Sequence, residues 1–277
     1  MSGILYVVAT PIGNLDDITI RAINVLKEVH LILAEDTRHS RQLLKHLQIE
    51  KPLLSLHEHN EEQRISKIKE NLSQGYNLAL ISDAGTPLIS DPGYNLISSL
   101  REENFNIVPI PGACALIAAL CVSGLPTDSF IFMGFLAAKE NKRKEQLSNL
   151  ALERRTMIFY ESVYRIKDML ADAITIFGAN RIATLAREIS KKYETIKKST
   201  LNDLLQSLKE NEQQIRGEFV VIITGNFEEK SEDNYDIDHL LSLFMDELPT
   251  KQAVNLAVKI TGIKKNIIYK KALSMKT

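Results

Sequence analysis

The stretch SDAGTPLISDPG, residues 82–93, lies between an apolar run that ends at Ile81 and a helical pattern that begins at Tyr94. A strand therefore runs into a loop that Gly85 opens to a close backbone approach and that two prolines stiffen. In an open parallel sheet, ligands bind beyond the carboxyl ends of the strands. The loop is expected to offer backbone N–H groups and two carboxylates to a small molecule, although its composition equally suits a structural turn.

Alternating strand and helix patterns extend outward from this loop. Strands are predicted at residues 4–9, 31–34, 76–81 and 105–110. Helices are predicted at 15–29, after Asp36 or Ser40, at 60–74, from Tyr94 to Leu100 and at 113–122. This alternation predicts an α/β domain with a parallel sheet covered on both faces.

The pattern restarts after residue 122, which indicates a second α/β domain. Its predicted strands are 130–135, 156–160, 181–186 and 218–224, and the segment KENKRK, residues 139–144, is predicted as a basic loop. The predicted domains are therefore 1–122 and 123–227.

An acidic linker, 228–247, and a basic appendage, 248–277, are predicted to follow. Six acids and one lysine lie between Glu228 and Asp238, whereas the appendage has seven lysines and no acid. Gly262 separates two short helical patterns there, which is typical of a helix-turn-helix. A plain packing element is the alternative.

Composition narrows the class of protein. The 277 residues are 44% hydrophobic and 25% charged, without a signal-peptide pattern or an apolar run long enough to span a membrane. Cys114 and Cys121 lie on a predicted helix about 10 Å apart along its axis, too far apart to bridge, so a reducing cytoplasmic setting is expected. The net charge of −1 means that any RNA contact has to come from local basic patches.

Charged clusters follow other strands. Residues 35–41, EDTRHSR, occupy the same position after their strand as the loop 82–93 does, and could position a polar substrate or only cap the next helix. Glu161 and Arg187 follow strands of the second domain. The chain has no G-x-G-x-x-G fingerprint, P-loop or G-x-S-x-G elbow, and no metal spacing among its histidines. Dinucleotide, phosphoryl-transfer, serine-hydrolase and metal chemistry are therefore not predicted.

Six motifs carry a resemblance. They are residues 5–15 (LYVVATPIGNL), 34–38 (AEDTR), 82–93, 109–112 (PIPG), 159–162 (FYES) and 186–188 (ARE). In this order, and together with the C-terminal segment, they resemble the ribosomal RNA small subunit methyltransferase I family, a branch of the tetrapyrrole-methylase fold. The resemblance implies a parallel-sheet domain, a mixed-sheet domain and a small helical appendage, with S-adenosylmethionine bound between the two domains of a homodimer. It also implies 2′-O-methylation of a cytidine in the decoding region of 16S rRNA in the small ribosomal subunit, without a metal or a membrane.

The same resemblance implies the site residues. Those expected to bind the cofactor are Ile12, Gly13, Asp83, Ala84, Gly85, Thr86, Gly112, Ala113, Cys114, Met133, Gly134, Phe135, Tyr160, Ala186 and Arg187. A ribose hydroxyl is a poor nucleophile while protonated, so a carboxylate could help by taking its proton. Candidate proton acceptors are Glu35, Asp36 and Glu161, and candidates for steering RNA phosphates are Arg38 and Arg187.

Two rival functions stay open. One is a precorrin-type tetrapyrrole carbon methylase of the same fold, against which the lysine-rich tail argues. The other is a non-catalytic RNA-binding or ribosome-associated module, against which the Asp83–Thr86 loop argues, because binding alone does not require a cofactor loop.

Overall fold

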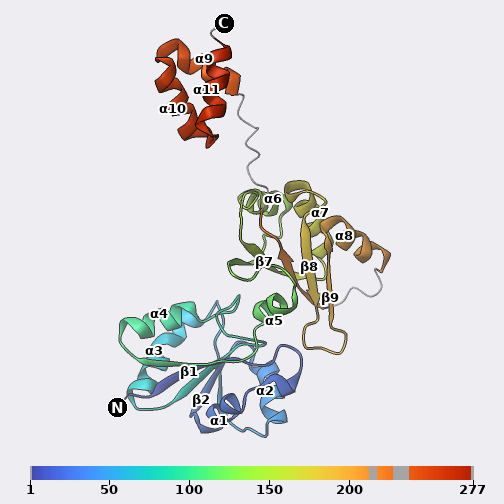
Figure 1. Cartoon of the computed structure of the whole chain (residues 1–277). Helices are drawn as coiled ribbons and strands as arrows, with labels where there is room; N and C mark the ends of the chain where they lie inside the picture. Colours follow the sequence, from blue (N-terminus) through green and yellow to red (C-terminus); the bar gives the residue numbers. More distant parts are fainter. Residues whose placement is uncertain (1, 212–216, 227–236, 276–277) are drawn as a thin grey trace. The chain divides into compact units, whose positions relative to one another are not determined.

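The computed structural model describes residues 2–211, 217–226 and 237–275. The chain forms two compact units, Met1–Gly225 and Asn226–Thr277 (Figure 1). The first unit contains two five-stranded sheets, and the second is helical.

The first sheet is entirely parallel, as predicted. Its order is β3-β2-β4-β1-β5, and its strands are β1 (Ile4–Val8), β2 (Leu31–Ala34), β3 (Leu53–Ser55), β4 (Leu78–Ile81) and β5 (Asn106–Ile110). The edge strand β3 was not predicted, because three residues are too short to show a period. The central strand β4 is buried along its whole length, as a strand covered on both faces must be.

Helices cover both faces of this sheet. One face carries α1 (Ile20–Glu28) and α2 (Thr37–His46), and the other carries α3 (Glu61–Ser73) and α4 (Tyr94–Glu102). Neighbouring strands β1 and β4 are therefore followed by helices on opposite faces. This reversal is a topological switch point, where α/β sheets bind ligands beyond the strand ends.

The predicted helix at 15–29 begins later than expected. Residues Leu15–Asp17 form one 3-10 turn, and α1 begins after Thr19, whose side chain accepts a hydrogen bond from the backbone N–H of Ala22. This capping bond fixes the start of the helix. The apolar period in the sequence continues across residues 15–19 and does not show this start.

The second sheet is mixed, as expected from the resemblance. Its order is β6-β7-β10-β8-β9, with β6 and β7 parallel and the other pairs antiparallel. The strands are β6 (Phe130–Phe135), β7 (Thr156–Ser162), β8 (Ile182–Arg187), β9 (Thr195–Thr200) and β10 (Glu218–Ile223). One face packs against α6 (Glu140–Ser148), α7 (Ile166–Phe177) and α8 (Leu201–Glu210), and the other against α5 (Ala115–Val122).

Helix α5 joins the two sheets. Leu116, Ala119 and Leu120 share a core with Ile158 and Val220 of the second sheet. The predicted boundary after residue 122 assigned this helix to the first domain, whereas its apolar face packs on the second sheet. In its packing, α5 therefore belongs with the second sheet.

The predicted basic loop at 139–144 is wrong, because these residues form the start of α6, with Lys139 at the N-cap. Arg143 is 4% exposed, and its Nε donates to Asp172 Oδ2 of α7 at 2.7 Å. All of the first six residues of α6 are charged or amidic, so the sequence shows no apolar period there. A buried ion pair takes the place of an apolar contact.

The second unit is a small bundle of α9 (Ile237–Glu247), α10 (Thr250–Thr261) and α11 (Lys265–Ser274). Its own core is formed by Leu241, Val254, Ala257, Ile263, Ile268 and Ala272. Gly262, at φ 74°, ends α10 as predicted. Residues 237–247 of the predicted acidic linker are helical, and residues 228–236 lie outside the described residues. Among the described helices, none is long and apolar enough to cross a membrane.

Candidate functional site

Two loops meet at the switch point. The loop after β1 and the loop 82–93 after β4 are joined by an isolated bridge: Thr10 N donates to Gly85 O at 2.8 Å, and Gly85 N donates to Thr10 O at 3.1 Å. Gly85 has φ +87°, a conformation that suits glycine. Thr86 Oγ1 donates to Ala113 O at 3.0 Å, so the loop after β5 is tied to the same group. The polar backbone of all three loops is thus fixed in place.

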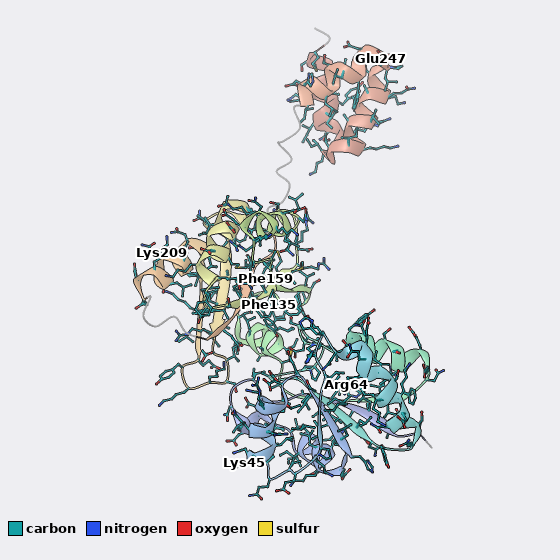
Figure 2. The ribbon with its side chains drawn as sticks, turned by 180° about the vertical axis from the view of Figure 1, so that it is seen from behind. Lys45, Arg64, Phe135, Phe159, Lys209 and Glu247 are labelled. Carbon is teal, nitrogen blue, oxygen red and sulfur yellow. The ribbon has the colours of Figure 1, made fainter. Side chains whose placement is uncertain are left out.

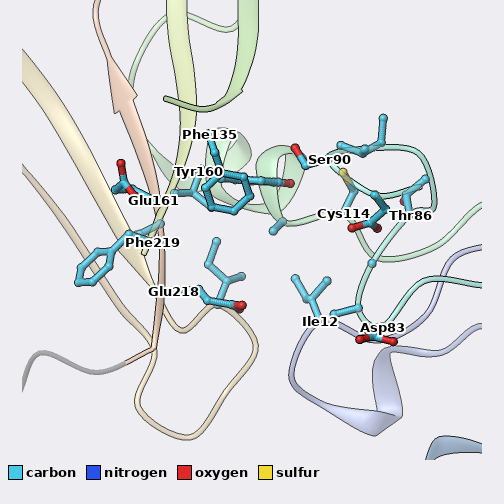
Figure 3. A pocket seen from close by; sticks show the side chains of 18 of the residues that line it. Ile12, Asp83, Thr86, Ser90, Cys114, Phe135, Tyr160, Glu161, Glu218 and Phe219 are labelled. Atoms are coloured by element: carbon cyan, nitrogen blue, oxygen red, sulfur yellow. The ribbon is translucent and has the colours of Figure 1, made fainter. Parts of the chain in front are cut away.

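These loops face the second sheet across a cavity of about 370 Å³ (Figure 3). We call it the cavity throughout. Its lining comes from the first sheet's loops, from the start of α5 and from the ends of β6, β7, β8 and β10. The lining residues are Ile12, Glu35, Asp83, Ala84, Gly85, Thr86, Ile89, Ser90, Asp91, Cys114, Ala115, Phe135, Tyr160, Glu161, Ser162, Ala186, Glu188, Ile189, Lys191, Glu218, Phe219 and Val220.

Tyr160 supports the aromatic wall of the cavity. Its hydroxyl accepts a hydrogen bond from Leu116 N in the first turn of α5 at 3.1 Å, and burial raises the pKa of this phenol. Phe132 and Phe135 meet its ring edge-to-face, with centroids 4.9 and 5.7 Å away. Tyr160 therefore stays neutral and fixes α5 against the sheet.

Three carboxylates gather on the side of the cavity formed by the first sheet. The pKa of Asp91 is raised to about 6: burial raises it most, the hydrogen bond from Ser82 lowers it, and the charges of Glu35 and Asp83 raise it. Burial and the charge of Asp83 also raise the pKa of Glu35. Asp83 Oδ1 accepts a hydrogen bond from Asp36 N at 3.1 Å, which ties the loop after β2 to the loop after β4. The group disfavours its own full ionisation, so a cation bound there would be stabilised.

The opposite wall carries a cluster of one lysine and two glutamates. Lys191 Nζ donates to Glu188 Oε1 at 2.8 Å and to Glu218 Oε2 at 3.4 Å. Burial opposes the charge of Lys191, but these two carboxylates outweigh it and raise its pKa. Glu188 Oε1 also accepts a hydrogen bond from Glu218 N at 3.2 Å. The cluster lies at the paired ends of β8 and β10, and with one lysine for two glutamates it adds net negative charge to that of the first sheet's carboxylates.

Backbone strain is concentrated in two loops at the cavity, the loop 82–93 and the loop after β8. Among the described residues, six other than glycine have positive φ, and four of them are Leu88, Ser90, Glu188 and Ser190. Such conformations cost about 1–3 kcal/mol each and persist where surrounding structure holds them. Their gathering around one cavity marks it as the functional site.

Eleven predicted site residues line the cavity. They are Ile12, Asp83, Ala84, Gly85, Thr86, Cys114, Phe135, Tyr160, Ala186, Glu35 and Glu161. Gly13, Gly112, Ala113, Met133 and Gly134 do not line it. Three of these are close-approach glycines: a Cβ would meet Lys191 Cγ at 2.4 Å at Gly13, Ala9 Cβ at 2.9 Å at Gly112, and Ser90 Oγ at 3.3 Å at Gly134. They hold the loops around the cavity together.

Arg187 does not reach the cavity, although it was predicted both to bind the cofactor and to steer phosphates. Successive strand residues point to opposite faces, and its neighbour Ala186 is the one that lines the cavity. Arg187 instead lines a separate hollow with Leu204 and Leu208 of α8, and its guanidinium donates to Tyr193 O at 3.3 Å.

Asp36 and Arg38 also lie outside the cavity lining. Asp36 caps α2, and the hydrogen bond from the Arg38 guanidinium lowers the pKa of its carboxyl to about 2. A carboxylate so stabilised is a weak base. Arg38 has an 88% exposed side chain and faces solvent.

Glu161 lines the cavity, but its carboxylate is bound by neighbouring groups at the end of β7. Its side chain is fully buried, and Oε1 pairs with Arg165 at 2.7 Å and accepts from Ser162 N at 2.8 Å. In Figure 3, the side chains of Glu161 and Phe219 point away from the hydroxyl end of Tyr160. Glu161 therefore braces the end of β7.

Some lining residues were not named as site residues from the sequence. Ile89, Ser90 and Asp91 lie within the motif 82–93, which was the available signal. Glu188, Ile189 and Lys191 lie in the polar segment after β8. Glu218, Phe219 and Val220 had no signal, because only the sheet order places β10 between β7 and β8. In the described part of the chain, no group of three or more His, Cys, Asp or Glu side chains is arranged to hold a metal ion, and both cysteines are free thiols.

Comparison with known proteins identifies the class of fold. Residues 4–205 match the model of Tetrapyrrole (Corrin/Porphyrin) Methylases, and residues 231–276 match that of the RsmI C-terminal HTH domain. A solved cobalt precorrin-4 methyltransferase, CbiF, superposes with a TM-score of 0.60 over 80% of this chain and 94% of that chain, at 18% identity. At this identity the likeness shows the fold alone. The chain thus has the two-domain fold of a tetrapyrrole methylase.

Curated relatives identify the family. The ribosomal RNA small subunit methyltransferase I of Haemophilus influenzae is 49% identical over 278 residues, covering 99% of this chain and 98% of that protein. The protein of the same name from Pasteurella multocida is 50% identical over 274 residues, covering 99% and 98%. The chain belongs to the ribosomal RNA small subunit methyltransferase I family, which confirms the resemblance of the six motifs.

Proposed function

We propose that this protein transfers the methyl group of S-adenosylmethionine to the ribose 2′-hydroxyl of a cytidine in the decoding region of 16S rRNA, cytidine 1402. The observation that carries the proposal is the cavity, in which the motif 82–93 of this family faces the second sheet at the switch point. The names of its relatives supply the substrate class.

The residues present fit the cofactor. A cavity of about 370 Å³ lies within the range of about 300–1,000 Å³ for small-molecule sites. Ile12, Ile89 and Phe135 offer apolar surface to a base, and the carboxylates of Glu35, Asp83 and Asp91 can accept hydrogen bonds from hydroxyl or ammonium groups. The same carboxylates favour a cationic sulfonium. When bound, the cofactor supplies a methyl group already activated by that sulfonium.

The task of the chain is then mainly positioning. Its loops have to hold the nucleophilic oxygen about 3 Å from the methyl carbon, in line with the leaving sulfur. A carboxylate with a pKa near the working pH is well suited to accept the hydroxyl proton. Asp91, with a pKa of about 6, meets this condition inside the cavity, and burial raises the pKa of Glu35 in the same direction, whereas Asp36 and Glu161 are each engaged by an arginine. We assign the role of proton acceptor to Asp91 or Glu35.

The proposal includes the expected partners. The substrate is the small ribosomal subunit or its RNA, the setting is the cytoplasm, and the enzyme acts as a homodimer. The two free thiols support a reducing compartment. Sedimentation velocity tests the dimer, because a homodimer doubles the mass of the 31.2 kDa chain.

Labelled S-adenosylmethionine tests the activity. The protein is incubated with unmethylated small subunits, with free 16S rRNA or with a porphyrinogen, and RNA nucleosides are separated by mass after nuclease digestion. We expect label in 2′-O-methylcytidine. Label in the porphyrinogen would establish the tetrapyrrole methylase instead, and absence of both label and cofactor binding would establish the non-catalytic module.

A matched pair of variants tests the cavity itself. Gly85→Ala and Gly178→Ala place a side chain at similar angles, φ +87° and +90°, but the Cβ at Gly85 meets Ile12 Cγ2 at 3.2 Å whereas the Cβ at Gly178 meets nothing within 4 Å. Both should lose about 1–3 kcal/mol of stability, because a positive φ disfavours a residue with a Cβ. We expect a loss of cofactor affinity of at least about tenfold by calorimetry in Gly85→Ala alone. Equal affinities in the two variants would contradict this site.

A further inference from the structure

Helix α2 has a cationic outer face. Its buried residues are Ser40 and Leu44, and Arg38, Arg41 and Lys45 are all exposed. The spacing i, i+3, i+7 places these three cations on one stripe, about 10 Å from end to end. The helix sequence TRHSRQLLKH contains no acid. Lys45 is labelled on this outer surface in Figure 2.

The stripe begins at the wall of the cavity. Glu35, the residue that follows β2, lines the cavity, and Asp36 caps α2. The bond from Asp36 N to Asp83 Oδ1 fixes the start of the helix to the motif loop. A nucleic-acid strand that leaves the cavity over this edge therefore meets Arg38 first and then the rest of α2.

A surface groove continues the stripe. Arg41, Lys45 and Lys51 line an open hollow of about 1,010 Å³ beside the edge strand β3, and the one acid in its lining is Glu50. The lining is completed by Leu44, Gln48, Ile49, Pro52 and Leu53. The groove thus adds net positive charge to the far end of the helix.

Arg38 pairs with Asp36 of its own helix start, and several cations of other helices are likewise engaged. Lys67 and Lys69 of α3 pair with Glu70 and Glu103, and Lys144 of α6 pairs with Glu140. In contrast, across residues 2–211, 217–226 and 237–275, Arg41, Lys45 and Lys51 form no ion pair. An exposed cation without an internal partner can bind an external anion without breaking an ion pair first.

We propose that Arg38, Arg41, Lys45 and Lys51 form a track that binds the phosphates of the RNA strand flanking the target nucleotide. This inference rests on the proposed function. With a net charge of −1, the protein has no overall attraction to RNA, so a local track has to supply it. Phosphate contacts fix register rather than read sequence, and this track would deliver the target nucleotide to the cavity.

The test compares two double variants that remove the same charge. Arg41→Ala/Lys45→Ala removes the middle of the track, and Lys142→Ala/Lys209→Ala removes two exposed lysines from α6 and α8, on the second sheet. Lys209 is labelled in Figure 2. Binding to unmethylated small subunits is measured from 50 to 200 mM salt, with methylation rates and cofactor affinity measured alongside.

Each lost phosphate contact lowers the slope of log K against log salt by about 0.7–0.9. We expect the Arg41→Ala/Lys45→Ala slope to fall by about 1.5, KM to rise about tenfold or more, and kcat at saturating substrate and cofactor affinity to stay unchanged. The control pair should match the wild-type enzyme. Arg41→Glu/Lys45→Glu should raise KM further, because repulsion replaces attraction.

The outcomes separate this inference from the proposed function. If the wild-type enzyme methylates the subunit and Arg41→Ala/Lys45→Ala keeps the slope and KM of the control pair, the track is refuted and the function stands. If the wild-type enzyme labels no RNA, the proposed function fails, and the track fails with it.

Discussion

Asp91 shows how a single residue of the motif loop serves the site at the expense of stability. Its pKa of about 6, raised first by burial and then by the charges of Glu35 and Asp83, lies above the ordinary value of 3.8. The folded state therefore holds the proton more tightly than the unfolded state does. Stability falls as pH rises through the interval from about 4 to about 6, and the full penalty is present above pH 6.

Replacing Asp91 with Asn should remove that penalty. At pH 8 we expect a gain of about 1 kcal/mol, because partial exposure screens the full shift, or about 2–4 °C in Tm for a unit of this size. At pH 5 the gain should be smaller, because the wild-type carboxyl is then largely protonated. Thermal melts at both pH values measure the effect, with the exposed Asp128→Asn as control.

The same substitution should lower the methylation rate while it raises stability. If Asp91 accepts the hydroxyl proton, the methylation rate of the wild-type enzyme rises with pH to a plateau above about 6, and Asp91→Asn lowers that plateau about 100-fold or more. If Asp91→Asn kept the wild-type dependence of rate on pH, Glu35 would be the proton acceptor instead. A stability gain of equal size at pH 5 and pH 8 would show that the carboxyl does not titrate in this range.

At the scale of elements, the buried pair between α6 and α7 takes the place of an apolar contact. The side chains of Arg143 and Asp172 are 5% and 8% exposed, and Arg143 also donates to Ala138 O at 3.2 Å. Lys144 Nζ lies 3.5 Å from the second oxygen of Asp172. The pair orients α6 against α7 through specific hydrogen bonds.

Removing one partner should cost far more than replacing both. Asp172→Ala leaves the Arg143 guanidinium buried without its carboxylate, and we expect a loss of about 3–5 kcal/mol in the free energy of unfolding. Arg143→Met/Asp172→Leu should recover most of that loss, since well-packed apolar pairs are often as stable as buried ion pairs. Urea unfolding of the three proteins measures this difference. A double variant as unstable as Asp172→Ala would show that the charges themselves hold α6 in place.

The same helix shows what the sequence could predict and what it could not. Strands β1 and β4 are short apolar runs and helix α3 has apolar residues at a helical period, and all three were predicted close to their observed bounds. Helix α6 has no such period at its start, and β3 has only three residues.

The site divides in the same way. The motif 82–93 predicted one wall of the cavity directly, because all of its ligand-facing groups are close together in the chain. The opposite wall depends on β10 entering the sheet between β7 and β8, and on strand alternation that turns Ala186 inward and Arg187 outward. Neither can be read from local sequence, because both depend on pairing between distant strands.

At the scale of the whole molecule, the chain separates the unit that contains the cavity from a second unit whose C-terminal segment is basic. Every residue that lines the cavity lies within Met1–Gly225. The second unit has its own apolar core, which includes Leu241, Val254 and Ile268. Seven lysines and no acid lie between Leu248 and Thr277. The second unit should therefore add to RNA affinity, alongside the α2 track of the first unit, without contributing to cofactor binding.

Ending the chain after Gly225 should test this separation. The shortened protein should bind S-adenosylmethionine within about twofold of the full chain, because it keeps the whole cavity, and its melting temperature should match the main transition of the full chain to within about 2 °C. Its affinity for small subunits should fall, with a lower salt slope, because the lysines of the second unit are lost. Calorimetry and salt titration measure these quantities on both proteins. A shortened protein that melted several degrees lower, or lost the cofactor, would show that the second unit stabilises the first, and the cavity would then depend on residues far from its lining.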